Sequence, residues 1–142
     1  MSDLITAAIN LLKDLIRLPS FSKQEDRTAE RIGEWFNHYG IPYERDGNNL
    51  WAKNKAFDPQ KPTLLLNSHH DTVEPNNAYT NDPFEAIILD GKLYGLGSND
   101  AGGALVSLIA LFTHYFNKEN LKYNLLVVAS AEEEIAGDNS LS

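Results

Sequence analysis

The chain has 142 residues, of which 42% are hydrophobic and 23% charged, a composition typical of one globular domain. The net charge is -8 and there is no basic cluster, which excludes a nucleic-acid backbone as partner. The sequence contains no cysteine, which excludes disulfides and thiol nucleophiles and leaves His, Asp and Glu as ligands for any transition metal. No apolar run is long enough to span a membrane and no signal peptide is recognised, so we expect a cytoplasmic location.

The N-terminal part of the chain predicts two helices. Apolar residues at helical spacing predict a helix over residues 3–18, which ends at Pro19. Ser22 and Glu25 have the spacing of a capping box, which predicts that a second helix opens here and continues to about Tyr39.

Hairpins, a strand and a long loop are expected next. Residues 43–53 and 86–94 each have the pattern of a β-hairpin with a glycine in the turn, and the apolar run at 64–68 predicts a buried strand. The segment 72–84 has no clear periodicity, and a polar loop of this length inside a compact domain is more often functional than idle.

A last helix and strand complete the pattern. We expect the helix over residues 101–116 and the strand over 121–130, whose apolar part at 125–129 is typical of a parallel sheet. The alternation of strands and helices predicts an α/β fold with a mixed, mostly parallel sheet and helices on both faces, an α/β/α sandwich. The strand at 125–129 is expected to lie at an exposed edge of this sheet.

Three polar clusters follow strand ends or precede a helix. His69 and Asp71 come directly after the strand at 64–68, Asp100 precedes the last helix, and three glutamates occupy 132–134. Because ligands gather at the carboxyl ends of strands in open α/β sheets, we expect the clusters to meet. Imidazole and carboxylate groups together suit Zn, Mn or Co.

Each cluster also has a structural alternative. His69 and Asp71 could simply be polar residues at a strand end, Asp100 could be the N-cap of the last helix, and the glutamates at 132–134 could form a solvated turn. The side chain of His70 alternates away from that of His69, so we interpret His70 as a residue that either packs in the core or supports the ligands from behind.

The clusters form part of a longer ordered motif that covers about half of the chain. It comprises His69-x-Asp71-x-Val73, Asp82-Pro83-Phe84, Asp90-Gly91-Lys92-Leu93-Tyr94-Gly95-x-Gly97-x-x-Asp100-x-x-Gly103 and Glu133-Glu134. This motif resembles the signature of the M20 di-zinc metallopeptidase and deacylase family. The segment 95–103 is most similar to the acetylornithine deacetylase branch, although Ala101 and Gly102 stand where many relatives have Met and Lys.

The resemblance implies a role for five residues. His69 would bind one zinc, Asp100 would bridge two ions and Glu134 would bind the second, while Asp71 would orient His69 and Glu133 would act as general base. The implied cofactors are two divalent ions, zinc in the first place and cobalt or manganese as alternatives.

The implied activity is hydrolysis of a linear amide in an N-acyl amino acid by a metal-bridging hydroxide, as in acetylornithine deacetylation for arginine biosynthesis. A dipeptidase or aminopeptidase of the same family is the alternative within the enzymes. A non-catalytic metal-binding fragment is the alternative outside them. A glycosidase that uses a carboxylate pair would have no use for His69.

The family also implies a larger protein than these 142 residues. By resemblance, residues 1–142 are the N-terminal portion of a catalytic domain, without a lid or dimerisation domain and without the C-terminal catalytic segment. We therefore expect the fragment alone to be inactive. The intact protein would be a homodimer that acts on a small N-acyl amino acid and has no nucleic-acid or membrane partner.

Overall fold

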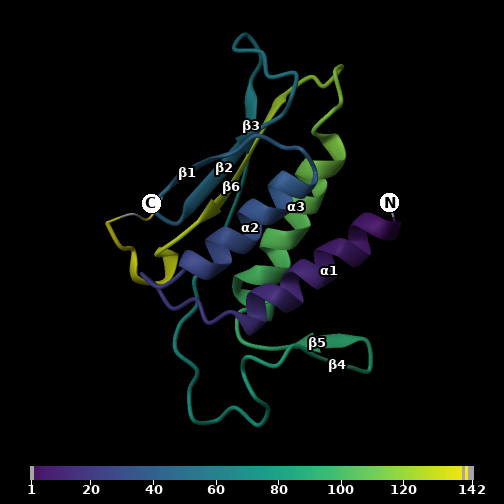
Figure 1. Cartoon of the computed structure of the whole chain (residues 1–142). Coiled ribbons are helices and arrows are strands. Elements are labelled where there is room, and N and C mark those ends of the chain that lie inside the picture. The colour runs from purple at the N-terminus through teal and green to yellow at the C-terminus, as the bar shows by residue number, and fades with distance from the viewer. Residues whose placement is uncertain (1, 139, 141–142) are drawn as a thin grey trace.

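The computed structural model describes residues 2–138 and 140. Within these residues, three helices pack on a four-stranded sheet, and a separate two-stranded hairpin lies apart from it (Figure 1). The helices are α1 (Ser2–Arg17), α2 (Asp26–His38) and α3 (Gly103–Tyr115). The sheet strands are β1 (Glu44–Asp46), β2 (Asn49–Lys53), β3 (Thr63–His69) and β6 (Asn124–Ser130), and the hairpin strands are β4 (Ile87–Leu89) and β5 (Lys92–Tyr94).

The strand order β1-β2-β6-β3 determines where the polar clusters lie. Strands β3 and β6 are parallel and end together, with His69 opposite Ser130, whereas β2 runs antiparallel to both β1 and β6. The predicted edge position of residues 125–129 is therefore wrong. The β1–β2 hairpin pairs with one side of β6 and β3 pairs with the other, so β6 has a neighbour on each side.

The core lies between one face of the sheet and the helices. Strand residues on this face alternate with outward-facing ones, and helix α3 covers β3 and β6 while α2 covers β2 and α1 packs on both helices. The largest fully buried side chains of the helices, Phe36 and Phe112, lie in this core. The predicted mixed α/β fold is confirmed, although of the sheet's strand pairs only β3–β6 is parallel.

The second face of the sheet carries no helix within residues 2–138 and 140 (Figure 1). The helices predicted for that face are thus not among the described residues. Leu65 on this face is 55% exposed, and Trp51, which pairs with Val128, is half-buried. None of the helices in the described part of the chain is both long and apolar enough to cross a membrane.

The start of α2 differs from the predicted capping box. Its N-cap is Glu25, which makes no side-chain capping hydrogen bond, and Ser22 lies in the preceding loop. The hydroxyl of Ser22 donates instead to Asp71, 49 positions further along the chain. The prediction was wrong because the Ser-x-x-Glu spacing describes a local pairing, and here a distant carboxylate is the acceptor for Ser22.

Candidate metal centre

His69 is the last residue of β3, and its ring is buried between two carboxylates. Its Nδ1 donates to the carbonyl oxygen of Asp71 at 3.0 Å and lies 3.4 Å from Asp71 Oδ1. The other ring nitrogen, Nε2, lies 3.2 Å from Asp100 Oδ1 and 3.6 Å from Glu133 Oε2. With Nδ1 held as the donor, Nε2 is the nitrogen that can bind a cation.

Asp71 is fully buried behind His69 and accepts several hydrogen bonds. Its oxygens accept from the Ser22 hydroxyl at 2.7 Å and from the backbone N–H groups of Glu133 and Glu134 at 3.1 Å each. Burial by itself would raise the pKa of Asp71, but hydrogen bonds from His69, Ser22 and the two N–H groups outweigh it and lower the pKa to about 2. Asp71 is therefore an ionised carboxylate at neutral pH.

The charge of Asp71 acts in turn on His69. Its hydrogen bonding raises the pKa of His69 to about 9 against the opposing effect of burial, and Glu133 adds a smaller contribution in the same direction. In the metal-free protein the ring is accordingly an imidazolium at neutral pH, so a cation that binds Nε2 must displace a proton.

Asp100 comes from an irregular turn, Ser98–Gly102, that leads into α3. Its backbone is not helical, with φ -117° and ψ 99°, and the helix begins at Gly103 with Gly102 as its N-cap. The N-cap alternative for Asp100 is therefore not what the structure shows. A Cβ on Gly102 would lie 2.6 Å from the carbonyl oxygen of Gly97, so the turn closes this tightly only with glycine at 102.

Glu133 and Glu134 occupy a short helical turn, Glu133–Ile135, directly after β6. The side chain of Glu133 is 56% exposed. Burial and the negative charge of Asp100 raise the pKa of Glu134. The part of this upward shift that comes from Asp100 reflects two carboxylates brought close together, and a bound cation would remove that repulsion.

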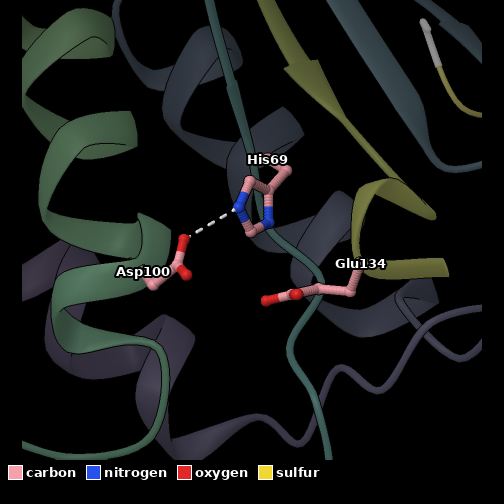
Figure 2. Close-up of side chains that lie close together, drawn as sticks. All are labelled: His69, Asp100 and Glu134. Atoms are coloured by element: carbon pink, nitrogen blue, oxygen red, sulfur yellow. Dashed lines mark hydrogen bonds and ion pairs between the residues drawn. The ribbon is translucent and has the colours of Figure 1, made fainter. Parts of the chain in front are cut away.

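The three groups predicted as metal ligands converge on one point (Figure 2). His69, Asp100 and Glu134 each offer one ligand atom, and these atoms all lie within 4.8 Å of one another. An imidazole nitrogen with two carboxylate oxygens fits a divalent cation such as zinc. The structure thus brings together all five predicted site residues, since Asp71 and Glu133 contact this group directly.

His70 points away from the centre, as the alternation along the strand predicts. Its Nε2 donates to the carbonyl oxygen of Asn48 at 2.9 Å, and its Nδ1 lies 2.8 Å from the Thr28 hydroxyl. Burial lowers the pKa of His70, so the ring is neutral and joins β3 to α2 and to the β1–β2 turn. Its role is structural.

Two residues of the centre's surroundings were missed at the level of sequence. Ser22 and Glu25 were both assigned to a local capping box and to nothing beyond it. Both lie in the loop between α1 and α2, and both bind residues far along the chain, Asp71 and Glu132. No local pattern around 22–25 indicates either partner.

Residues 65–142 match the sequence profile of Peptidase family M20/M25/M40. The chain belongs to this family. An uncharacterized metallohydrolase of Methanocaldococcus jannaschii is 32% identical over an alignment that includes 98% of this chain and 39% of the relative.

Solved structures share the fold. An M20 family metallo-carboxypeptidase from Sulfolobus solfataricus superposes with a TM-score of 0.73 and 25% identity, over 96% of this chain and 32% of that chain. A dinuclear metal binding peptidase of the M20 family from Bacillus subtilis superposes with a TM-score of 0.71 and 23% identity, over 96% of this chain and 38% of that chain. The chain thus spans between 32% and 39% of the length of these relatives.

Proposed function

We propose that the intact protein hydrolyses the linear amide bond of an N-acyl amino acid and requires divalent metal ions to do so. The observation that carries this proposal is the meeting of His69, Asp100 and Glu134 beside an exposed glutamate, Glu133, that is not one of the three converging ligands. Acetylornithine is the specific substrate that we propose, on the likeness of segment 95–103 to that branch of the family.

Two divalent ions, zinc in the first place, are the proposed cofactors. His69 would hold one ion, Glu134 the other, and Asp100 would be shared between them. When bound, the ions supply Lewis acidity, which polarises the substrate carbonyl and makes water acidic enough to react near neutral pH. The family's dinuclear member from Bacillus subtilis supports a pair of ions.

The proposed proton carrier is Glu133. Its Oε2 lies 3.6 Å from His69 Nε2, so the carboxylate reaches the ligand cluster while more than half of the side chain stays exposed to solvent and substrate. Glu133 would take a proton from the attacking water and then give it to the nitrogen of the leaving amine. Asp71 would keep the imidazole of His69 oriented throughout.

A groove beside the ligands offers room for the substrate. Its volume is about 230 Å³, and both Asp100 and Glu134 line it. Its other walls come from the loop after β3, including Thr72 and Tyr79, and from the segment 95–99 before α3. A small N-acyl amino acid fits a space of this size, with its amide bond next to the carboxylates.

A peptidase of the same family is the second candidate. The solved relatives with the same fold include a carboxypeptidase, and an amide and a peptide bond demand the same chemistry at the metal centre. The acyl group and the side chain of the substrate would decide between the two activities. The homodimer and the cytoplasmic location also remain proposals, as does the expectation that residues 1–142 alone are inactive.

A substrate panel tests the proposal. The intact protein loaded with zinc is offered N-acetylornithine, other N-acyl amino acids and dipeptides, and amine release is measured with and without a chelator. We expect the highest kcat/KM for N-acetylornithine and complete loss of activity on chelation. Preference for dipeptides would favour the second candidate, and turnover that persists in chelator would refute both.

A further inference from the structure

Four consecutive backbone N–H groups, at 131–134, each donate to a side chain from another part of the chain. The acceptors are Asn49 Oδ1 at 2.9 Å, Glu25 Oε1 at 3.2 Å, and Asp71 Oδ1 and Oδ2 at 3.1 Å each. Every residue from 131 to 134, where the chain enters the turn that presents Glu133 and Glu134, is therefore fixed by a hydrogen bond to a distant side chain.

Glu25 is the least expected of these acceptors. Its side chain is 0% exposed, and within residues 2–138 and 140 no Lys, Arg or His forms an ion pair with it. Its carboxylate is satisfied by neutral donors: the N–H groups of Lys23 and Glu132 on Oε1, and Asn48 Nδ2 on Oε2. Burying a carboxylate without a cation costs free energy, so these three hydrogen bonds must offset a large desolvation penalty.

The backbone that Glu25 binds is itself strained. Glu132 has a left-handed conformation with φ 57°, which a residue with a side chain adopts only when its surroundings enforce it. The sharp change of direction at Glu132 turns the chain from β6 into the turn, so that Glu133 and Glu134 face His69. Loss of the acceptor at Glu132 N–H would let this residue relax to an extended conformation and move both glutamates.

We propose that Glu25 is a positioning residue of the metal centre, which fixes the backbone of Glu132 and through it the placement of Glu133 and Glu134. The role depends on the reach of the side chain and on an acceptor oxygen at its end. A glutamine at 25 can keep its Oε1 as the acceptor for Lys23 and Glu132 and loses only the acceptor for Asn48 Nδ2, whereas an aspartate keeps the charge and is too short to reach Glu132.

The test compares Glu25→Gln with Glu25→Asp in the intact, zinc-loaded protein, with Glu30→Asp as the control. Glu30 is exposed on α2, five positions after Glu25. Hydrogen exchange of the amides at 131–134 is measured for each variant, together with kcat and KM for the best substrate of the panel. Only the kinetic part rests on the proposed function; the exchange part is valid for any activity.

We expect Glu25→Asp to speed exchange at 131–134 by about tenfold or more, the effect of one lost hydrogen bond to a charged group. The same variant should lower kcat about tenfold with KM changed less than about threefold, because the glutamates are misplaced while the groove walls formed by Thr72, Tyr79 and the segment 95–99 are unchanged. Glu25→Gln should retain most of the activity, and its amides at 131–134 should exchange nearly as slowly as in the unmodified protein. Glu30→Asp should match the unmodified protein in both measurements.

The opposite ranking, with Glu25→Asp active and Glu25→Gln impaired, would show that charge and not reach matters, and would overturn the proposal. Unchanged exchange at 131–134 in Glu25→Asp would overturn it as well. If no substrate is turned over by the unmodified protein, the proposed function fails, and the exchange comparison still decides the role of Glu25.

Discussion

The hydroxyl of Ser22 donates a 2.7 Å hydrogen bond to Asp71 Oδ2 and so joins the loop before α2 to the carboxylate behind His69. Asp71 is the meeting point of the centre, since the same carboxylate accepts the N–H groups of Glu133 and Glu134. The loop between the first two helices is thereby part of the metal centre's support, although it contributes no ligand.

Ser22→Ala is predicted to destabilise the protein. Removal of a hydrogen bond to a buried, ionised carboxylate costs about 1–2 kcal/mol of unfolding free energy. Urea denaturation measures the change. Ser107→Ala is the control, because the Ser107 hydroxyl is exposed and donates only to Gly103 one turn back in α3, so its change should stay within about 0.5 kcal/mol. Equal effects of the two substitutions would argue against the importance of the Ser22–Asp71 bond.

Asp71→Asn is predicted to destabilise the metal-free protein by about 1–3 kcal/mol at neutral pH. The NH2 group of asparagine cannot accept a hydrogen bond, and it would face at least one of the donors that now bind Asp71. The folded-state pKa of Asp71, about 2, lies below its ordinary value of 3.8. The stability that its ionisation contributes is hence fully present above 3.8 and is lost as the pH falls through about 2. Unfolding measurements between those two pH values should find the difference between the two proteins shrinking with acid; a constant difference would contradict the hydrogen-bonded carboxylate.

Zinc binding is predicted to release a proton from His69. The pKa of His69 is raised from 6.5 to about 9, so below pH 9 the metal-free ring is protonated and the ion must displace that proton. Apparent zinc affinity should rise with pH up to about 9, by about tenfold per unit for one proton. Calorimetry in two buffers of different ionisation enthalpy counts the released protons. Affinity that does not depend on pH between 6 and 9 would contradict an imidazolium at His69.

The same raised pKa has a consequence for the protein without metal. The stability that the His69–Asp71 interaction contributes is fully present below pH 6.5 and is lost as the pH rises through about 9. Thermal unfolding of the chelated protein across this range should find the melting temperature falling on the alkaline side. A His69→Ala variant, which lacks the titrating group, should lose this part of the decline.

Glu133→Gln is predicted to lower kcat by about 10²–10⁴-fold while zinc binding is retained, since the carboxylate is assigned to proton transfer and not to the ion. Metal analysis and amine release are measured on the same preparation. Glu119→Gln, an exposed position after α3, is the control for loss of one negative charge. Full activity of Glu133→Gln would remove Glu133 from the reaction.

The sequence allowed the centre's groups to be predicted because their positions follow a topological rule. His69 and the glutamates at 132–134 come directly after apolar strands, and parallel strands end at one edge of a sheet. The pairing of β3 with β6, and the closing of the turn Ser98–Gly102 against them, brings the groups to within a few ångströms.

The rest could not be predicted because it depends on pairings between distant segments. The central place of β6 follows from its pairing with the β1–β2 hairpin, which no local pattern specifies. The bonds from Ser22 to Asp71 and from Glu132 to Glu25 span 49 and 107 positions. Motifs of a few residues describe local pairings and therefore assigned Ser22 to the wrong one.

Anomalous scattering at the zinc edge, from crystals of the intact protein grown with zinc, tests the metal assignment most directly. We predict a peak within bonding distance of His69 Nε2 and of a carboxylate oxygen of Asp100, and a peak that touches Glu134. Loss of the first peak in His69→Ala would complete the result. Zinc bound only elsewhere, with these three side chains free, would contradict the assignment of this site as the metal centre.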